Sequence, residues 1–287
     1  MLSPAELREV QLTELEILTE IDRICRKNGI RYCVIAGTLL GAVRHEGFIP
    51  WDDDADVALL RPEYERFAEA CRRDLDESRF YFQDHRHTPG YRWGYGKLRR
   101  RGTLFQRQHQ EHMPYEQGVF VDVFPLDGVP DAWSGRAIEN FRCFVLRKFL
   151  WSRVGRRADR SRWKRGLYTL MDQVPESVIL KAYEKRIRAA GTDTAWVRIL
   201  MFPTPNRQYG YLRCWYEEQG EVLFEGTHFQ GIRDYDAYLR FKFGNYLQLP
   251  PPAERKTHPV SALKLLPERK AAGGRDEKGT KHADAGI

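Results

Sequence analysis

The segment from residue 35 to residue 60 constrains the fold more than any other part of the chain. It begins within an apolar run, residues 32–36, which is short and β-branched enough to form a buried strand. Gly37 interrupts this pattern, and Thr38 is placed to cap a short helix that continues to His45. The sequence therefore predicts a strand that turns abruptly into a helix.

Carboxylates dominate the second half of this segment, where they lead directly into the apolar run 57–60. They are Asp52, Asp53, Asp54 and Asp56. Side chains two apart on a strand point to the same face, so Asp54 and Asp56 are expected to converge. Two like charges this close repel each other unless a cation lies between them. Oxygen ligands favour Mg²⁺ or Mn²⁺. For Asp52 and Asp53, a solvated loop is an equally good interpretation.

A third carboxylate, Asp122, stands alone between apolar residues in the run 118–125. An ionised acid in such a strand is costly without a partner. A Gly-Thr pair after one strand, a short helix, and Asp-x-Asp on the next strand is the layout of the nucleotidyltransferase fold. In that fold the carboxylates hold a metal, and amides at the helix N-terminus hold a phosphate. We therefore expect Asp122 to join Asp54 and Asp56.

Residues 37–56 resemble the signature of the LicD family, which includes bacterial phosphocholine transferases and is similar to fukutin-type ribitol-phosphate transferases. Residues 119–128 and 243–251 fit the same family. The resemblance spans roughly residues 10–260 and is weaker over 133–215. It implies an α+β fold of the nucleotidyltransferase type, with a mixed β-sheet flanked by helices.

The resemblance also implies roles for particular residues. Asp54, Asp56 and Asp122 would be the catalytic residues and the ligands of Mg²⁺ or Mn²⁺, with Asp122 favoured as the base. The expected substrate-binding residues are Gly37, Thr38, Arg44, His45, Trp51, Lys97 and Arg99. Strand alternation would send Lys97 and Arg99 toward the metal site, although a solvated basic face is the alternative. Trp51 could face a quaternary ammonium group or simply be buried. His258 could close over the site or be structural.

The sequence predicts one domain, residues 1–267, with a helical insertion at 133–190 and a disordered tail at 268–287. Its 42% hydrophobic and 30% charged residues are ordinary for a soluble protein. Five scattered cysteines suit reduced thiols and argue against a zinc site. No apolar run is long enough for a membrane span, and the N-terminus does not resemble a signal peptide. We therefore expect a cytoplasmic protein.

The insertion is strongly basic and contributes much of the net charge of +7. Nine Lys and Arg residues fall within residues 147–165, where Asp159 is the one acidic residue. Such a segment can contact the inner face of an anionic membrane, hold an acidic polymer, or form a solvated face. Nucleic acid is a less favoured partner because no recognised nucleic-acid module is present.

The resemblance to the LicD family implies metal-dependent transfer of a phospho-alcohol, with phosphocholine favoured, from a CDP-activated donor such as CDP-choline. The acceptor would be a hydroxyl of a cell-surface glycan or its lipid-linked precursor, and CMP would be released. Two alternatives remain open at this point. One is a nucleotidyltransferase that attacks the α-phosphate and releases pyrophosphate, and the other is a non-catalytic protein that binds glycan or nucleic acid.

Overall fold

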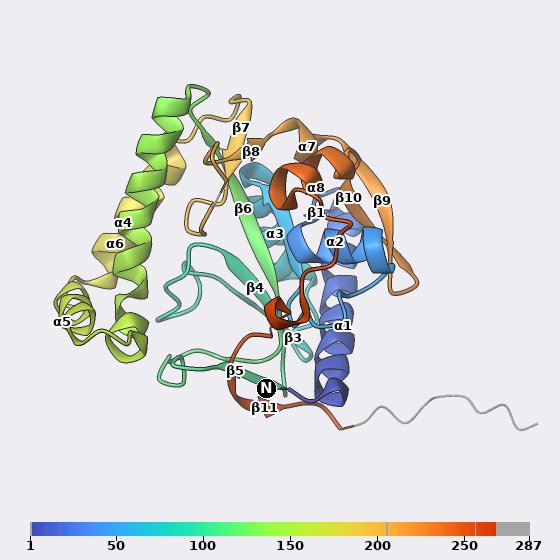
Figure 1. Cartoon of the computed structure of the whole chain (residues 1–287), viewed down its shortest axis with the longest axis horizontal. Coiled ribbons are helices and arrows are strands. Elements are labelled where there is room, and N and C mark those ends of the chain that lie inside the picture. The colour runs from blue at the N-terminus through green and yellow to red at the C-terminus, as the bar shows by residue number, and fades with distance from the viewer. Residues whose placement is uncertain (1, 205, 256, 268–287) are drawn as a thin grey trace, which may run out of the picture.

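A mixed β-sheet flanked by helices forms the centre of the molecule (Figure 1). The computed structural model describes residues 2–204, 206–255 and 257–267. The expected disordered tail, 268–287, lies outside these residues. Within them, the main sheet has nine strands, seven of which follow the order β3-β4-β6-β2-β1-β10-β9. β7 pairs antiparallel with the last residues of β6, and its other edge pairs with β8. Parallel and antiparallel pairs occur together, which confirms the predicted α+β fold of the nucleotidyltransferase type.

The strands of this sheet are β1 (Cys33–Val34), β2 (Asp56–Leu60), β3 (Phe80–Gln83), β4 (Gly96–Arg100), β6 (Phe120–Val129), β7 (Trp196–Arg198), β8 (Tyr211–Leu212), β9 (Gln219–Phe224) and β10 (Thr227–Ile232). A separate pair consists of β5 (Leu104–Arg107) and β11 (Val260–Lys264). The helices are α1 (Pro4–Asn28), α2 (Ala36–His45), α3 (Arg61–Asp74), α4 (Trp133–Ala158), α5 (Arg162–Met171), α6 (Glu176–Ala189), α7 (Cys214–Glu217), α8 (Tyr235–Phe243) and the 3₁₀ turn η1 (Pro252–Glu254).

Helix α1 begins and ends where its sequence signals lie. Ser3 and Glu6 form a reciprocal capping box, and Gly29 ends the helix with a left-handed φ of 59°. The apolar stripe of α1 is buried against the sheet, and Ile17 and Ile21 are fully inaccessible. This helix therefore packs on the core, as its stripe predicts.

Helix α2 begins earlier than the sequence suggested. Ile35 precedes its first residue, so Thr38 lies inside the helix and does not cap it. The first amide finds another partner, because Ala36 N–H donates to the Tyr238 hydroxyl at 3.3 Å. Ala36 has a φ of 51°, which marks the sharp turn from β1 into α2. The prediction of a Thr38 cap was wrong because this partner comes from α8, some 200 residues away.

Helical spacing predicts that Tyr235, Tyr238, Leu239 and Phe243 of α8 face the core. Two of them, Tyr235 and Phe243, are nevertheless 40% and 42% exposed. Tyr238 and Leu239 are buried as expected. The helix packs against α2 and β10, and Tyr238 in its middle bonds to the first residue of α2.

Residues 133–190 form a helical layer beside the sheet, built from α4, α5 and α6 (Figure 1). This layer has a small core of its own, which includes Cys143, Leu150 and Ile179. Tyr183 of α6 bonds this layer to the loop before β4, since its hydroxyl donates to Gly94 O at 2.6 Å. In the described residues, no helix has the length and apolar character needed to cross a membrane.

Candidate active site

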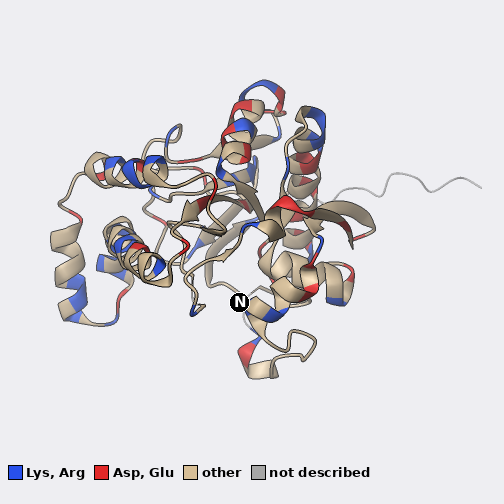
Figure 2. Ribbon diagram, turned by 90° about the horizontal axis from the view of Figure 1, so that it is seen from above, with Lys and Arg blue, Asp and Glu red and all other residues tan. Residues whose placement is uncertain are grey.

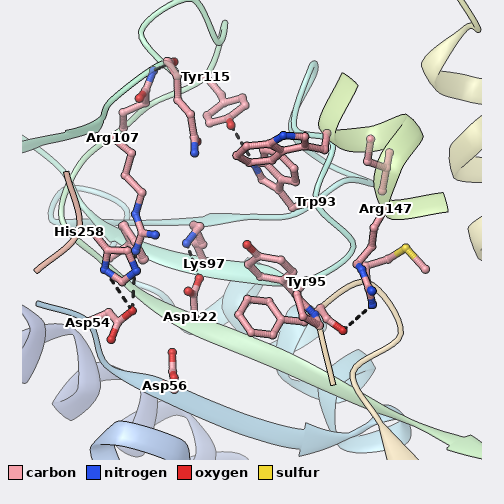
Figure 3. A pocket seen from close by; sticks show the side chains of 18 of the residues that line it. Asp54, Asp56, Trp93, Tyr95, Lys97, Arg107, Tyr115, Asp122, Arg147 and His258 are labelled. Carbon is pink, nitrogen blue, oxygen red and sulfur yellow. Dashed lines mark hydrogen bonds and ion pairs between the residues drawn. The ribbon is translucent and has the colours of Figure 1, made fainter. Parts of the chain in front are cut away.

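A cavity of about 590 Å³ lies between the central strands and α4 (Figure 3). Its polar lining residues include Asp54, Asp56, Lys97, Arg99, Arg107, Asp122, Arg147, Lys148 and His258. Its aromatic lining residues are Trp93, Tyr95, Phe105, Tyr115, Phe120, Phe144, Trp151 and Phe202. The basic insertion therefore supplies one wall of the cavity, because α4 contributes residues to both sets.

Three neighbouring strands place charged side chains in one row on the cavity floor. Parallel pairing of β2 with β6 puts Asp56 beside Asp122, and antiparallel pairing of β4 with β6 puts Lys97 on the other side of Asp122. Residues in register on adjacent strands point to the same face of a sheet. Asp54, two residues before Asp56, also lines the cavity. The structure thus brings together the three carboxylates that the sequence predicted to converge.

The carboxylates of this row differ in their partners. Asp122 accepts from Lys97 Nζ in a buried ion pair, so the expectation that a bound ion would be its partner was incomplete. Asp54 Oδ2 lies 3.8 Å from Arg107 and 3.7 Å from His258 Nδ1. In the described part of the chain, the Asp56 carboxylate has no hydrogen bond or ion pair of its own. Burial, together with Asp54 and Asp122, raises the pKa of Asp56 well above its ordinary value.

Metal binding stays a prediction. Among the residues that the structure describes, no group of three or more Asp, Glu, His or Cys side chains is arranged so that it could hold an ion. Lys97 pairs with Asp122, while Arg107 and His258 lie 3.8 and 3.7 Å from the Asp54 carboxylate. The carboxylate oxygens of Asp54, Asp56 and Asp122 nevertheless suit a hard cation, and the Asp56 carboxylate makes no ion pair in the described residues. Burial also raises the pKa of Asp54, against the opposing effect of His258 and Arg107.

Three cations surround the ring of Phe120 on the same floor. Lys97 Nζ lies 3.3 Å from the ring centroid, and the guanidinium carbons of Arg99 and Arg107 lie at 5.0 and 5.2 Å. Arg99 is fixed by Gln83 Oε1 at 2.8 Å. Burial lowers the pKa of Lys97 to about 7, although Asp122 opposes this shift. An anionic group entering the cavity would therefore meet concentrated positive charge.

The start of α2 does not open into the cavity, so Gly37 and Thr38 lie away from it. A Cβ atom at Gly37 would meet Asp52 Oδ2 at 2.6 Å, so a carboxylate of the chain already lies against this turn of the helix. Thr38 is buried, and its Oγ1 accepts from Asp56 N–H at 2.8 Å. Burial, Asp54 and Asp53 raise the pKa of Asp52 to about 8. Thr38 thus positions the backbone of Asp56.

Three other predicted substrate-binding residues also lie outside the cavity lining. Arg44 donates to Tyr246 O at 2.8 Å and to His45 Nε2 at 3.0 Å. His45 meets the Trp51 ring edge to face. The Arg255 guanidinium lies 4.5 Å from the centre of the Trp51 ring, so an internal cation already occupies a face of that ring. These side chains form a separate cluster near the end of α2.

Asp53 is also part of the structure around the site, which the solvated-loop interpretation did not anticipate. It is 1% exposed and accepts from both His258 N–H at 3.0 Å and His258 Nδ1 at 2.9 Å. The pairing of β11 with β5 holds this C-terminal segment in place. Glu14 of α1 is buried beside the same acidic loop, and burial raises its pKa well above the ordinary value.

Sequence reasoning did not identify the aromatic wall. The rings of Trp93 and Trp151 have centroids 6.0 Å apart, and Trp93 Nε1 donates to the Tyr115 hydroxyl at 2.9 Å (Figure 3). The ring centroids of Tyr95 and Phe202 lie 5.9 Å apart. The aromatic-rich stretch 91–98 was a usable signal, but its partners come from α4 and from loops distant in sequence. Arg107 was missed too, although alternation on β5 places it on the face of Phe105, and both line the cavity.

Comparison with known proteins gives a consistent result. Residues 29–142 match the family model described as LicD/FKTN/FKRP, nucleotidyltransferase domain. The chain is 26% identical over 264 residues to the lipopolysaccharide cholinephosphotransferase LicD of Haemophilus influenzae, which covers 91% of this chain and 98% of that protein. An uncharacterised protein of Rickettsia typhi is 37% identical over 65 residues, 21% of each chain. The matched segment of this chain, residues 29–142, includes Asp54, Asp56, Asp122 and the strand of Lys97.

Proposed function

This chain belongs to the LicD family of phosphotransferases, and on that premise we propose that it transfers phosphocholine from CDP-choline to a glycan hydroxyl, releasing CMP. The observation that carries this proposal is the row formed by Lys97, Asp122 and Asp56 on the cavity floor. It puts carboxylates, the ligand type that Mg²⁺ prefers, beside cations, which pair with phosphates, in one cavity.

The cationic groups of the cavity would bind and orient the pyrophosphate of the donor. Lys97 and Arg107 line the floor, and Arg147 enters from α4 (Figure 3). Phosphoryl transfer needs positioning and charge neutralisation more than covalent help, so fixed cations are suited to this step. Arg147 donates to Phe202 O at 2.9 Å, which holds its guanidinium at the aromatic side of the cavity.

The carboxylates would serve the metal and the acceptor. Asp54, Asp56 and Asp122 would hold Mg²⁺ or Mn²⁺, which when bound neutralises charge on the phosphates and the departing CMP. Release of Lys97 from Asp122 would free this carboxylate for the ion or for the proton of the acceptor hydroxyl. Asp122 is our preferred base because it lies in the middle of the row.

The aromatic wall supports choline as the transferred alcohol. Trp93, Trp151 and Tyr115 form a group of rings at the side of the cavity lined by α4. A quaternary ammonium binds to the faces of such rings, whereas glycerol and ribitol offer them no charge. The Haemophilus relative is named as a cholinephosphotransferase of lipopolysaccharide, which supports phosphocholine as the transferred group and a glycan as the acceptor. The five free thiols support a reducing, cytoplasmic compartment.

The proposal is tested by a donor screen with CDP-choline, CDP-ethanolamine, CDP-glycerol and CDP-ribitol, in which CMP is measured with and without Mg²⁺. We expect CDP-choline to give the highest kcat/KM. An Asp56→Asn variant should be inactive, and Asp76→Asn should retain activity as the matched control, since Asp76 lies on the exposed turn before β3. Release of pyrophosphate from CTP and phosphocholine would instead support a nucleotidyltransferase. Failure to bind Mg²⁺–CDP-choline in calorimetry would contradict both the phosphocholine transferase and the nucleotidyltransferase.

A further inference from the structure

Helix α5 buries almost none of its apolar surface. Trp163, Leu167 and Leu170 are 76%, 43% and 63% exposed, and Tyr168 is the buried residue that anchors the helix. The Tyr168 ring covers Gly155 of α4, where a Cβ atom would meet it at 2.6 Å. Both views place α5 at the outer edge of the molecule, beyond α4 as seen from the sheet (Figures 1 and 2).

The exposed apolar residues of α5 form one stripe. Positions 163, 167 and 170 are separated by four and three residues, a spacing that aligns side chains along one side of a helix. Single exposed apolar residues are normal on a protein surface, but three aligned large ones on one helix are not. The stripe is therefore available to a partner outside the described chain.

The cations around the stripe are free to interact with that partner. Arg153 and Arg156 are engaged internally, because both pair with Asp172. Among the described residues, five other basic side chains of this region make no ion pair: Arg157, Arg160, Arg162, Lys164 and Arg165. Figure 2 shows this Lys and Arg colouring on α5 and on the segment that joins it to α4. The basic surface expected over residues 147–165 is thus concentrated at α5 and the segment before it.

We infer that α5 lies in the headgroup region of an anionic lipid bilayer, with Trp163, Leu167 and Leu170 inserted at the acyl boundary. An apolar stripe flanked by Arg and Lys is the chemistry of an interfacial helix, and Trp prefers this depth. A second copy of the chain would bring an equal positive charge to the contact, so self-association is disfavoured. An acidic polymer would use the cations but leave the stripe exposed.

The same helix is connected to the cavity. Lys148 lines the cavity and donates from Nζ to the Tyr168 hydroxyl at 3.3 Å. A bilayer that holds α5 would therefore hold the α4 wall near the membrane surface. This inference does not depend on phosphotransfer and goes beyond it.

The experiment is co-flotation of the full chain with vesicles of phosphatidylcholine alone and with about one third phosphatidylglycerol. We expect binding to the anionic vesicles, weakened by salt. A Trp163→Ala/Leu167→Ala/Leu170→Ala variant should bind at least about tenfold more weakly. The matched control is Leu247→Ala/Leu249→Ala, which removes apolar residues that are 60% and 47% exposed elsewhere and should bind like the wild type.

Two further variants of α5 test the contributions of its charges and of Trp163 separately. An Arg162→Gln/Lys164→Gln/Arg165→Gln variant should also lose binding, and Trp163→Ala alone should lose about three- to tenfold if the triple variant does not fold. Far-UV circular dichroism and thermal melts check folding. The inference is overturned if the wild type ignores anionic vesicles, if the stripe variant binds as tightly as the control, or if light scattering shows that the stripe joins two copies instead.

Discussion

Asp52 is a buried carboxylate whose protonation should be visible in the stability of the protein. It lies against Gly37 of α2, and burial and its neighbours raise its pKa from 3.8 to about 8. Between these pH values the folded chain holds a proton that the unfolded chain has released, so stability falls as pH rises from about 4 to 8. An asparagine at this position does not titrate, so it removes this pH-dependent loss of stability.

We therefore predict that Asp52→Asn melts about 5 °C above the wild type at pH 9 in EDTA, and that this gain disappears near pH 4.5. Thermal melts of both proteins across this pH range measure the difference. Asp76→Asn should show no such trend, because Asp76 is fully exposed. A gain for Asp52→Asn that is independent of pH would refute the assigned titration.

Trp93 should discriminate between donors. Replacing it with Leu removes a ring from the aromatic wall but keeps an apolar side chain, so the loss should be specific for a quaternary ammonium. We expect kcat/KM for CDP-choline to fall about 5- to 30-fold, and that for CDP-glycerol to change by less than about threefold. Equal losses for both donors would show that Trp93 only maintains the shape of the cavity.

At the scale of elements, an ion pair links the sheet, α3 and the helical layer. Arg61 of α3 donates to both oxygens of Asp127 on β6 at 2.7 Å, and also to the Tyr183 hydroxyl of α6 at 3.2 Å. Asp127 is 1% exposed. Removing one partner of a buried pair leaves a charge without compensation, which costs several kcal/mol.

Arg61→Ala is therefore predicted to lower the free energy of unfolding by about 3–5 kcal/mol. Urea denaturation at pH 7 measures this, and the control variant Arg240→Ala, which removes an exposed ion pair, should unfold like the wild type. A loss below about 1 kcal/mol for Arg61→Ala would mean that the pair does not join these elements.

Some contacts between these elements could be predicted from local sequence patterns, and others could not. Alternation along one strand is local, so the shared direction of Asp54 and Asp56 could be predicted. The pairing of Lys97 with Asp122 depends on the register between β4 and β6, which no local pattern specifies. A substrate phosphate was expected at the N-terminus of α2, but the Asp52 carboxylate lies against Gly37 at that position. The first amide of α2 donates to the Tyr238 hydroxyl and not to Thr38. Tyr238 lies 202 residues after this amide in the sequence, so no local pattern could predict the contact.

At the scale of the whole molecule, the two functional surfaces meet on α4. Its residues Phe144, Arg147 and Trp151 form a wall of the cavity, while its last turns carry α5. The sequence predicted a helical, basic insertion at 133–190 and gave no reason to place it at the site. The side chains of α4 that line the cavity show that the insertion completes it.

Residues of the floor should control both metal binding and catalysis. Asp54→Asn and Asp56→Asn are each expected to abolish turnover while leaving the melting temperature in EDTA unchanged or higher, because each removes charge from a repulsive group. Asp122→Ala should behave differently and lose about 3–5 kcal/mol of stability, since it leaves Lys97 buried without its partner. Urea denaturation of the three variants checks this contrast, and turnover by either asparagine variant would contradict the assignment of the floor.

The position of bond cleavage tests the central claim most directly, and it requires no knowledge of the acceptor. Slow hydrolysis of CDP-choline in ¹⁸O-water by the wild type, followed by mass spectrometry, reports which phosphorus is attacked. We predict that the label enters phosphocholine, that CMP leaves unlabelled with the bridging oxygen, and that Asp56→Asn forms neither product. Label in CMP, or unchanged turnover by Asp56→Asn, would contradict phosphocholine transfer at this row of charges.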